Sequence, residues 1–278
     1  MSYVTWTKGS DLRIWADTLM ARQKLPALVR RLVHATVEKP KLVQFPADEG
    51  IQRRGWDGRL ETLTGNAWVP EGLSVWEMGA NQDPRDKAEG DYTTRLKNFG
   101  AINPAEFVFV FVTPRKWEGK QQWLEEKRAQ HIWRDVLAWD CDDLEQWLEH
   151  APAVDAWLAR LLNKLPIGVM DISTYWSSLA GTTAPPLTPQ VFIAQRDTAA
   201  GKLRNAITMP SSEIVVAAMS PRELQDFACA VFAEAEEEQQ DAFAARAIIV
   251  QSLEAWAQLS TSSCRLLLIP SAVSLNLV

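Results

Sequence analysis

Several features that define common protein classes are scarce or missing in this 278-residue sequence. Its three cysteines and three histidines are widely separated, so neither a zinc cluster nor a disulfide framework is expected. No apolar run approaches the ~20 residues of a membrane-spanning helix, and the first residues lack the basic-then-apolar pattern of a secretion signal. These absences favour a globular protein of the cytoplasm with no membrane span.

The charge of the chain is uneven along its length. The formal net charge is −6, which argues against a general nucleic-acid coat protein. The first 46 residues carry eight Lys or Arg and three acids, whereas residues 221–254 carry eight acids and two arginines. This asymmetry fits a front end that faces a polyanion, and it equally fits ordinary charged helix faces. Charge alone does not choose between the two.

A stretch rich in proline and threonine divides the sequence into two predicted parts. Residues 178–190 contain three prolines, which disfavour both helix and sheet. We therefore predict a first domain over residues 1–177, a linker over 178–190 and a second α/β segment over 191–278. Because a parallel sheet needs more strands and two covered faces, the second segment is expected to be a partial domain. It is either degenerate NTPase-like or the start of a longer protein.

Hydrophobic patterning in the first part predicts an α/β fold with a mixed sheet flanked by helices. Turn residues between the first three short strands indicate an antiparallel meander. Phe107–Val112 is apolar on both faces and should form a central buried strand. The predicted helices cover residues 11–37 (interrupted or restarted near Pro26), 84–98, 121–129 and 142–165, the last opened by a capping box from Asp142 to Glu145. The predicted strands cover 42–45, 60–63, 73–78, 107–112 and 135–139.

The second part is predicted to contain three strands and one amphipathic helix. The strands are expected at residues 214–217, 247–250 and 265–270, and the helix at 221–237. Residues 199–203 (AAGKL) partly match a phosphate-binding loop. Arg196 stands where such a loop needs glycine, and Leu203 stands where it needs Ser or Thr. Nucleotide binding by this segment is therefore not expected.

Two carboxylates in the first part have the arrangement of a metal site. Asp57 lies in the turn that enters one predicted strand, and Glu77 lies within the next. Carboxylates on adjacent strands of a hairpin can converge on a hard cation such as Mg²⁺, which activates water and offsets charge on a phosphodiester. Alone, Asp57 is equally a turn residue, since Asp-Gly is a common turn pair. Glu77 interrupts an apolar strand, and its alternative role is at a strand edge that faces solvent.

These residues, in their order, resemble the PD-(D/E)xK or restriction-endonuclease-like nuclease superfamily. The resemblance extends through VWEMG at 75–79, KAEGDYTTR at 87–95, FVFVTPRKW at 109–117 and DDLEQWL at 142–148. Together the segments are similar to nuclease modules at the front of bacterial anti-phage NTPases. The resemblance implies a restriction-endonuclease-like sheet over about residues 10–165, with Asp57 and Glu77 binding Mg²⁺ or Mn²⁺ and double-stranded DNA as substrate.

One position departs from the superfamily pattern. Gly79 stands where a lysine, two residues after the acid, usually helps to activate water. Lys87 on the following helix is the predicted replacement, and Gln82 is a second candidate for orienting the water. Lys87 also has an ordinary alternative as a solvated charge on a polar helix. If neither reaches the site, the domain would bind DNA without cutting it.

Basic residues flank the two carboxylates in the sequence. They suit phosphate contacts, which position a DNA backbone without reading its sequence; the alternative is that they only keep loops soluble. The predicted DNA-binding set is Arg53, Arg54, Arg59, Arg115 and Lys116. The 13 tryptophans are expected to pack in the core rather than stack on bases.

The sequence thus predicts a Mg²⁺-dependent DNA endonuclease effector of a bacterial anti-phage defence system. The resemblance implies activation by a fused or associated sensor NTPase or by formation of a homo-oligomer. The alternative is a catalytically inactive module with the same fold that binds DNA or mediates protein assembly. Gly79 is the residue that favours this alternative.

Overall fold

The computed structural model describes residues 5–38, 40–46, 55–99, 102–208, 217–260 and 266–271. The chain divides into two compact units. One unit is Thr7–Leu148, and the other joins Met1–Trp6 to Glu149–Val278. The division therefore falls ahead of the predicted linker at 178–190, which lies inside the second unit. Each unit is described by itself.

The first unit is built on a five-stranded mixed sheet with the strands in chain order. The first three strands form the predicted antiparallel meander, and the last two run parallel to the third. Every residue of the fourth strand is buried, as predicted, although the central strand of the five is the third. The strands are β1 (Leu42–Gln44), β2 (Gly58–Thr62), β3 (Gly72–Met78), β4 (Phe107–Val112) and β5 (Asp135–Trp139). The α/β class with a mixed sheet is thus confirmed.

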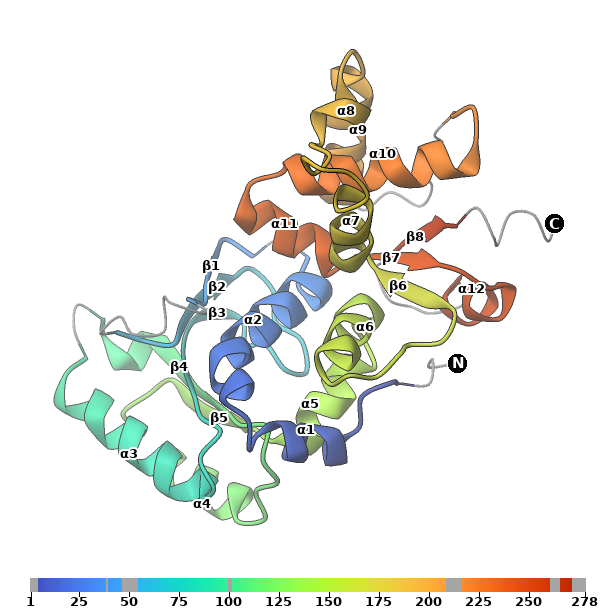
Figure 1. The fold of residues 1–278 in the computed structure, drawn as a ribbon. Helices are drawn as coiled ribbons and strands as arrows, with labels where there is room; N and C mark the ends of the chain where they lie inside the picture. Colours follow the sequence, from blue (N-terminus) through green and yellow to red (C-terminus); the bar gives the residue numbers. More distant parts are fainter. Residues whose placement is uncertain are drawn as a thin grey trace. The chain divides into compact units, whose positions relative to one another are not determined.

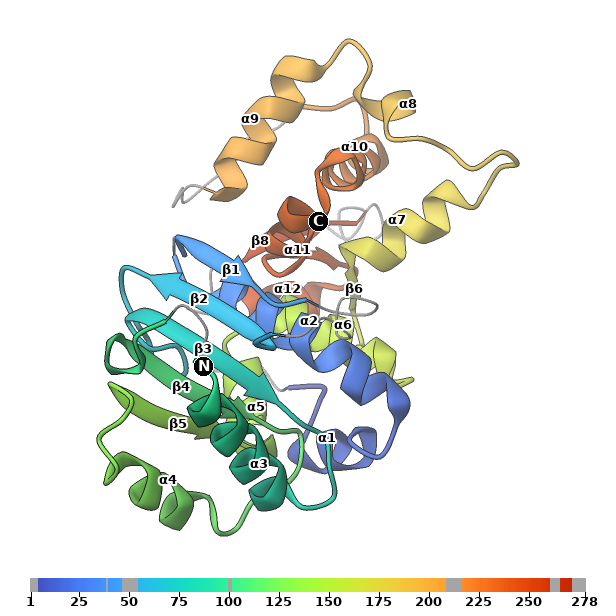
Figure 2. The same ribbon diagram turned by 90° about the vertical axis from the view of Figure 1, so that its left-hand side faces the viewer.

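Helices cover both faces of this sheet (Figures 1 and 2). On one face, α3 and α4 enclose an aromatic core that includes Tyr92, Phe109 and Trp123. On the other face, Trp76 packs edge-on against Phe45 with ring centroids 5.6 Å apart, and Trp147 of α5 lies beyond it. The helices are α1 (Gly9–Trp15), α2 (Leu19–Thr36), α3 (Pro84–Lys97), α4 (Lys120–Arg128) and α5 (Cys141–Leu148), with a 3₁₀ turn at Pro104–Glu106.

The first predicted helix is broken at a different residue from the one expected. Helix α2 continues through Pro26, and the break between α1 and α2 falls near Thr18. The Thr18 side chain accepts a hydrogen bond from the Ala21 amide at 3.2 Å and so caps α2. Leu25 and Leu28, on either side of Pro26, are almost fully buried. Their packing offsets the loss of one helical hydrogen bond at the proline.

The capping box that opens α5 also differs from the prediction. The carboxylate of Asp140 accepts from the Asp143 amide at 3.4 Å, and Asp143 accepts from the Asp140 amide at 2.8 Å. The reciprocal pair is therefore Asp140 and Asp143 rather than Asp142 and Glu145. Glu145 instead accepts from the amide of Gly9 at 2.6 Å, at the start of α1. The predicted single helix over 142–165 is two helices, because α5 ends at Leu148.

The second unit contains a three-stranded sheet in the order β6 (Val169–Asp171), β7 (Ala247–Val250), β8 (Leu267–Pro270). Strand β6 runs antiparallel to β7, and β8 runs parallel to it. Residues 169–171, assigned above to the first domain, therefore belong to this second sheet. The helices are α6 (Pro152–Leu161), α7 (Ile172–Ala180), α8 (Gln190–Ile193), α9 (Asp197–Thr208), α10 (Pro221–Glu234), α11 (Glu237–Ala244) and α12 (Leu253–Ser260).

Predictions for the second part are confirmed only at some elements. Strands β7 and β8 and helix α10 lie at or close to their expected residues. The strand predicted at 214–217 falls outside the described residues except for Ala217, which is in no regular element. The AAGKL segment lies inside helix α9, so it forms no phosphate-binding loop. No helix within the described part of the chain is long and apolar enough to cross a membrane.

Candidate functional site

The register between β2 and β3 brings the two predicted metal ligands together. Gly58 pairs with Trp76, and Arg59 pairs with Val75. Continued by one residue, this antiparallel register sets Asp57 opposite Glu77, and directly opposed residues project from the same face. Val75, two residues before Glu77, belongs to the core beneath α3. Both carboxylates therefore lie on the face of the sheet that α3 covers.

Asp57 is held by the backbone of the neighbouring strand. Its Oδ2 atom accepts a hydrogen bond from the Met78 amide at 2.8 Å. Burial raises the pKa of Asp57 above its usual value, although the Met78 amide and the charges of Lys87 and Arg95 act in the opposite direction. The Asp57 carboxyl group is thus fixed in place while much of its hydration is lost.

Glu77 is the most deeply buried acid of this group, with a residue exposure of 3%. Burial raises the pKa of Glu77 to about 8, despite a hydrogen bond from Arg95, and the nearby charge of Asp57 adds to the rise. The Arg95 Nε atom donates to Glu77 Oε1. Asp57 and Glu77 are therefore close enough to repel each other, and neither has enough compensating charge to behave as an ordinary surface carboxylate.

Lys87 lies across the backbone at Gly79, the position that departs from the superfamily pattern. A Cβ atom added to Gly79 would lie 2.5 Å from Lys87 Cγ and 3.0 Å from Lys87 Cε. The Lys87 side chain thus fills the space that any side chain at position 79 would need to enter. Its ammonium donates to Asp91 Oδ1 at 2.6 Å, and its charge lowers the pKa of Asp57.

The acids of this face outnumber the cations beside them. Burial is the first cause of a raised pKa at Asp57, Glu77 and Asp91. Among the described residues, the cations whose charges lower these pKa values are Lys87 and Arg95. Asp91 Oδ2 is buried with no hydrogen-bond partner in the described part of the chain. With all three acids ionised, the group would carry one uncompensated negative charge. Carboxylate oxygens with such an imbalance are a donor set that suits a hard divalent cation.

Helix α3, which supplies Lys87 and Arg95, is anchored to α4 by the ion pair between Glu89 and Lys127. The Lys127 ammonium of α4 lies 2.8 Å and 2.7 Å from the two oxygens of Glu89 on α3. The Trp123 indole donates to the same carboxylate at 2.9 Å, and Lys127 lies 5.1 Å from the centroid of the Tyr92 ring. These contacts fix the rotation of α3 about its axis, and so they fix where Lys87 and Arg95 point.

Two other predicted site residues, Gln82 and Arg115, have partners other than the two carboxylates. Gln82 donates to Asp17 at 2.8 Å and is exposed, so it is turned away from the carboxylates. Arg115 donates to the carbonyl groups of Ala80 and Ala16 and pairs with Asp17 at 2.7 Å. These contacts use its guanidinium group to join loops of the first unit, which argues against its predicted role in DNA binding.

Two of the predicted DNA-binding residues are exposed, and two others lie outside the described residues. Arg59 is exposed on the same face of the sheet as Asp57, and its side chain makes no hydrogen bond or ion pair with any residue that the structure describes. Lys116 is also exposed but pairs with Asp142. Arg53 and Arg54 fall in residues 47–54, of which the structure gives no description.

Arg95 and Asp91 belong to the site but were not predicted as its principal residues. Lys87, Asp91 and Arg95 recur every four residues along α3, and residues four apart lie on one face of a helix. This spacing of charges on a helix that follows the Glu77 strand is the signal that would have identified them. Arg95 also lies 4.6 Å above the ring of Trp56 and donates to the Gly55 carbonyl, so it contacts the loop that carries Asp57.

A second cluster of potential ligands occurs at the start of α5. One side-chain ligand atom from each of Asp140, Cys141 and Asp142 lies within 4.8 Å of the others. Asp140 accepts from backbone amides, including that of Trp117 at 3.2 Å, while Asp142 pairs with Lys116. Burial raises the pKa of Cys141 to about 12, so its thiol keeps its proton. Existing partners thus satisfy this cluster without a metal.

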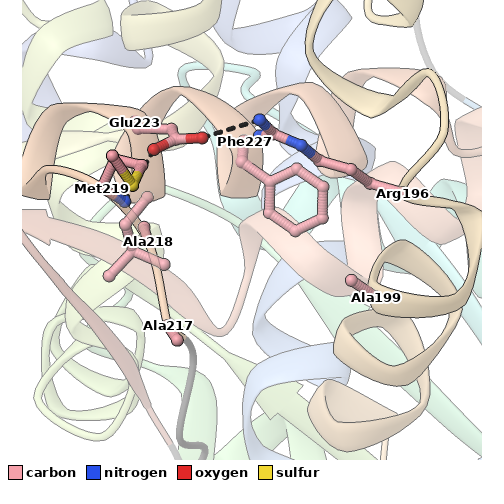
Figure 3. Close-up of a pocket in the computed structure, with 8 residues that line it drawn as sticks. Arg196, Ala199, Ala217, Ala218, Met219, Glu223 and Phe227 are labelled. Carbon is pink, nitrogen blue, oxygen red and sulfur yellow. Dashed lines mark hydrogen bonds and ion pairs between the residues drawn. The ribbon is translucent and has the colours of Figure 1, made fainter.

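The second unit has a pocket of about 410 Å³ beside helix α10 (Figure 3). Phe227 and Ala199 line it, and an ion pair between Arg196 and Glu223 at 2.7 Å spans its rim. Its wall at Ala217 adjoins residues 209–216, which the structure does not describe. The polar side chains of the rim already bind each other, so the pocket offers no cluster of reactive groups.

Comparisons with protein-family models, with curated proteins and with solved structures each gave no match to this chain. The candidate site therefore depends on its own geometry and chemistry.

Proposed function

We propose that the first unit is a divalent-metal-dependent endonuclease that hydrolyses phosphodiester bonds of double-stranded DNA. The observation that carries this proposal is the pairing of Asp57 with Glu77 on one sheet face, with Lys87 occupying the space over Gly79. Two carboxylates can hold a divalent cation that activates water, and an ammonium beside them can offset the negative charge that develops on a phosphodiester. Their meeting across three separate elements is difficult to explain by packing alone.

Each residue has a distinct role in this proposal. Asp57 and Glu77 would hold Mg²⁺ or Mn²⁺, and a bound ion would lower the pKa of a water and offset charge on the phosphate. Lys87, oriented by Asp91 at 2.6 Å, supplies a positive charge beside the same carboxylates and can donate to the attacking water or to the phosphate. Arg59 supplies an exposed cation on the same face for the DNA backbone.

A plasmid-nicking assay in Mg²⁺ or Mn²⁺ tests the proposal. We expect nicking by the wild-type chain and a loss on the order of 100-fold or more in Asp57→Asn and Glu77→Gln, because each removes charge from the proposed ligand set. Asp142→Asn is the matched control, since it neutralises an exposed acid of the other cluster. Equal nicking by all four proteins, or none by the wild type, would overturn the catalytic proposal.

A second candidate function is an inactive module of the same fold that binds DNA. The observation that favours it is the hydrogen bond from Arg95 to Glu77, which gives that carboxylate a partner other than a metal. With the pKa of Glu77 raised to about 8, most of the metal-free protein carries a protonated Glu77 at neutral pH. DNA binding that falls steeply with salt, in a chain that never nicks, would favour this module.

The wider biological role is proposed from the sequence resemblance alone. A nuclease fused to or associated with a sensor NTPase would act in anti-phage defence when the sensor, or the formation of an oligomer, raises its basal activity. The experiment is to measure nicking by the chain alone across a range of protein concentrations. A specific activity that rises with concentration supports control by oligomer formation, and a constant one contradicts it.

A further inference from the structure

Arg95 makes three contacts that together hold it at the proposed metal site. Its Nε atom donates to Glu77 Oε1, and its Nη2 atom donates to the Gly55 carbonyl. Its guanidinium also lies 4.6 Å above the Trp56 ring. The Arg95 side chain is 21% exposed and that of Glu77 is 4% exposed, so the pair is largely withdrawn from water. Within this group, the positive charge nearest to Glu77 is that of Arg95.

A divalent cation bound to Glu77 would share that carboxylate with the Arg95 guanidinium. Two cations that share one carboxylate repel each other, and the repulsion is larger where little water screens it. The Glu77 oxygen that accepts from Arg95 is also a lone-pair donor that a metal would use. Binding of a metal at Glu77 and the Arg95 contact therefore oppose each other.

We propose that Arg95 is an internal competitor of the metal, occupying Glu77 until a divalent cation displaces it. The inference rests on the proposed function, because it assumes that Glu77 is a ligand. Arg95 lowers the metal affinity of the site and keeps Glu77 paired when the cation is absent. The Arg95 hydrogen bond thereby satisfies a buried oxygen of Glu77 in the metal-free state, whether or not that side chain is protonated.

A purely structural role for Arg95 predicts the opposite effect on metal binding. Arg95 ties the Gly55–Trp56 segment, which leads directly into Asp57, to α3. If its only role were to hold this loop, its removal would loosen Asp57 and weaken the binding of a metal. The sign of the change in affinity therefore separates competition from support.

The test is calorimetric titration of the whole chain with Mn²⁺, without DNA, so that no activity is measured. We expect Arg95→Gln to bind Mn²⁺ on the order of tenfold more tightly than wild type, because one opposing charge is removed. Arg85→Gln is the matched control on the same helix, where Arg85 pairs with Glu126 at 3.0 Å, and it should leave the affinity unchanged. The double variant Arg95→Gln/Glu77→Gln should lose the gain.

Two further measurements keep the result interpretable. Circular dichroism establishes whether Arg95→Gln folds. If it does not, Arg95→Lys is titrated instead. This variant should bind Mn²⁺ about threefold more tightly than wild type, because the shorter, non-planar lysine side chain cannot keep both hydrogen bonds of Arg95.

The possible outcomes separate this inference from the proposed function. Equal or weaker binding in a folded Arg95→Gln, beside a wild type that binds Mn²⁺, overturns the competition alone. Absence of binding in every protein overturns the metal site and the competition with it. Binding by Arg95→Gln but not by wild type supports the competition and identifies the wild-type chain as the inactive module.

Discussion

Two groups of acids in the first unit differ in how their charge is compensated. Asp140 and Asp142 lie at the start of α5, where backbone amides and lysines already bind them. Asp57 and Glu77 lie on the sheet beneath α3, where burial raises both pKa values. By contrast, Lys116 holds the pKa of Asp142 below its usual value.

The comparison teaches that closeness of acidic side chains does not by itself identify a metal site. The α5 group has the tighter cluster of ligand atoms, yet each carboxylate there has a structural task. In the sheet group, ionisation of Asp57, Glu77 and Asp91 together would leave a deficit of positive charge, and that deficit is what a divalent cation would relieve. A lysine exchange, a pH series on Glu77→Gln and a substitution of Asp142 test this difference between the two groups of acids.

The largest expected effect is on the nicking rate when the lysine is moved from position 87 to position 79. We expect Lys87→Ala to lower nicking on the order of 100-fold, because it removes the ammonium beside Asp57. Gly79→Lys in that background should regain about tenfold, since the space over position 79 has been emptied. Gly79→Lys alone should also lose activity, because its Cβ would lie 2.5 Å from Lys87 Cγ. Initial rates of plasmid nicking measure all three.

Lys97→Ala, an exposed lysine at the end of the same helix, is the control for this exchange. It should nick like the wild type. If the double variant Gly79→Lys/Lys87→Ala nicks no faster than Lys87→Ala, the two positions do not deliver an ammonium to the same place.

A smaller effect is expected on the pH dependence of stability. The pKa of Glu77 is raised from 4.5 to about 8, so between these values the folded protein keeps a proton that the unfolded chain releases. Stability contributed by this group therefore falls as the pH rises through that window and levels off above pH 8. Glu77→Gln cannot ionise, so at pH 8 it should be more stable than wild type by on the order of 4 kcal/mol.

Urea unfolding in EDTA at pH 5, 6.5 and 8 measures this difference. The gap between Glu77→Gln and wild type should widen from the lowest pH to the highest. A gap that stays constant over the three values would show that Glu77 titrates as an ordinary carboxylate, and the contrast with the α5 group would be lost.

The smallest effect is expected at the α5 group. Asp142 is half exposed and paired with Lys116, and such surface pairs contribute little to stability. Asp142→Asn should therefore leave the melting temperature and the Mn²⁺ affinity of the chain unchanged, when measured by calorimetry. Loss of Mn²⁺ binding in this variant, with binding kept in Glu77→Gln, would move the metal site to α5.

Much of the first unit could be predicted from periodicity and turn residues. Phe107–Val112 is predicted as a central, fully buried strand. It is observed buried at every residue as the fourth of five strands, because only a strand covered on both faces accommodates apolar residues at every position. The break between α1 and α2 was misplaced to Pro26, because the packing of the residues around that proline is not visible in a local pattern. Strand β6 was missed because three residues give too short a pattern.

The candidate site could be predicted only in part. Glu77 stands out because an acid interrupts an apolar strand, and Asp57 stands out at the turn that enters the preceding strand. Lys87 follows as the lysine nearest in sequence after Gly79. Arg95 was not assigned a role, since a charge on a polar helix is usually solvated. Arg115 was assigned to DNA, yet it binds the Ala80 and Ala16 carbonyl groups, which no sequence pattern reveals.

By itself, the sequence determined which residues alternate or cluster, and therefore the α/β class, the strand order of the meander and the pair Asp57 and Glu77. These follow from local patterns, because strand and helix periods are properties of neighbouring residues. Only the tertiary structure decided that Lys87 crosses Gly79 and that Arg95 binds Glu77. Those contacts depend on the rotation of α3 against the sheet, which distant residues such as Lys127 fix through packing and charge.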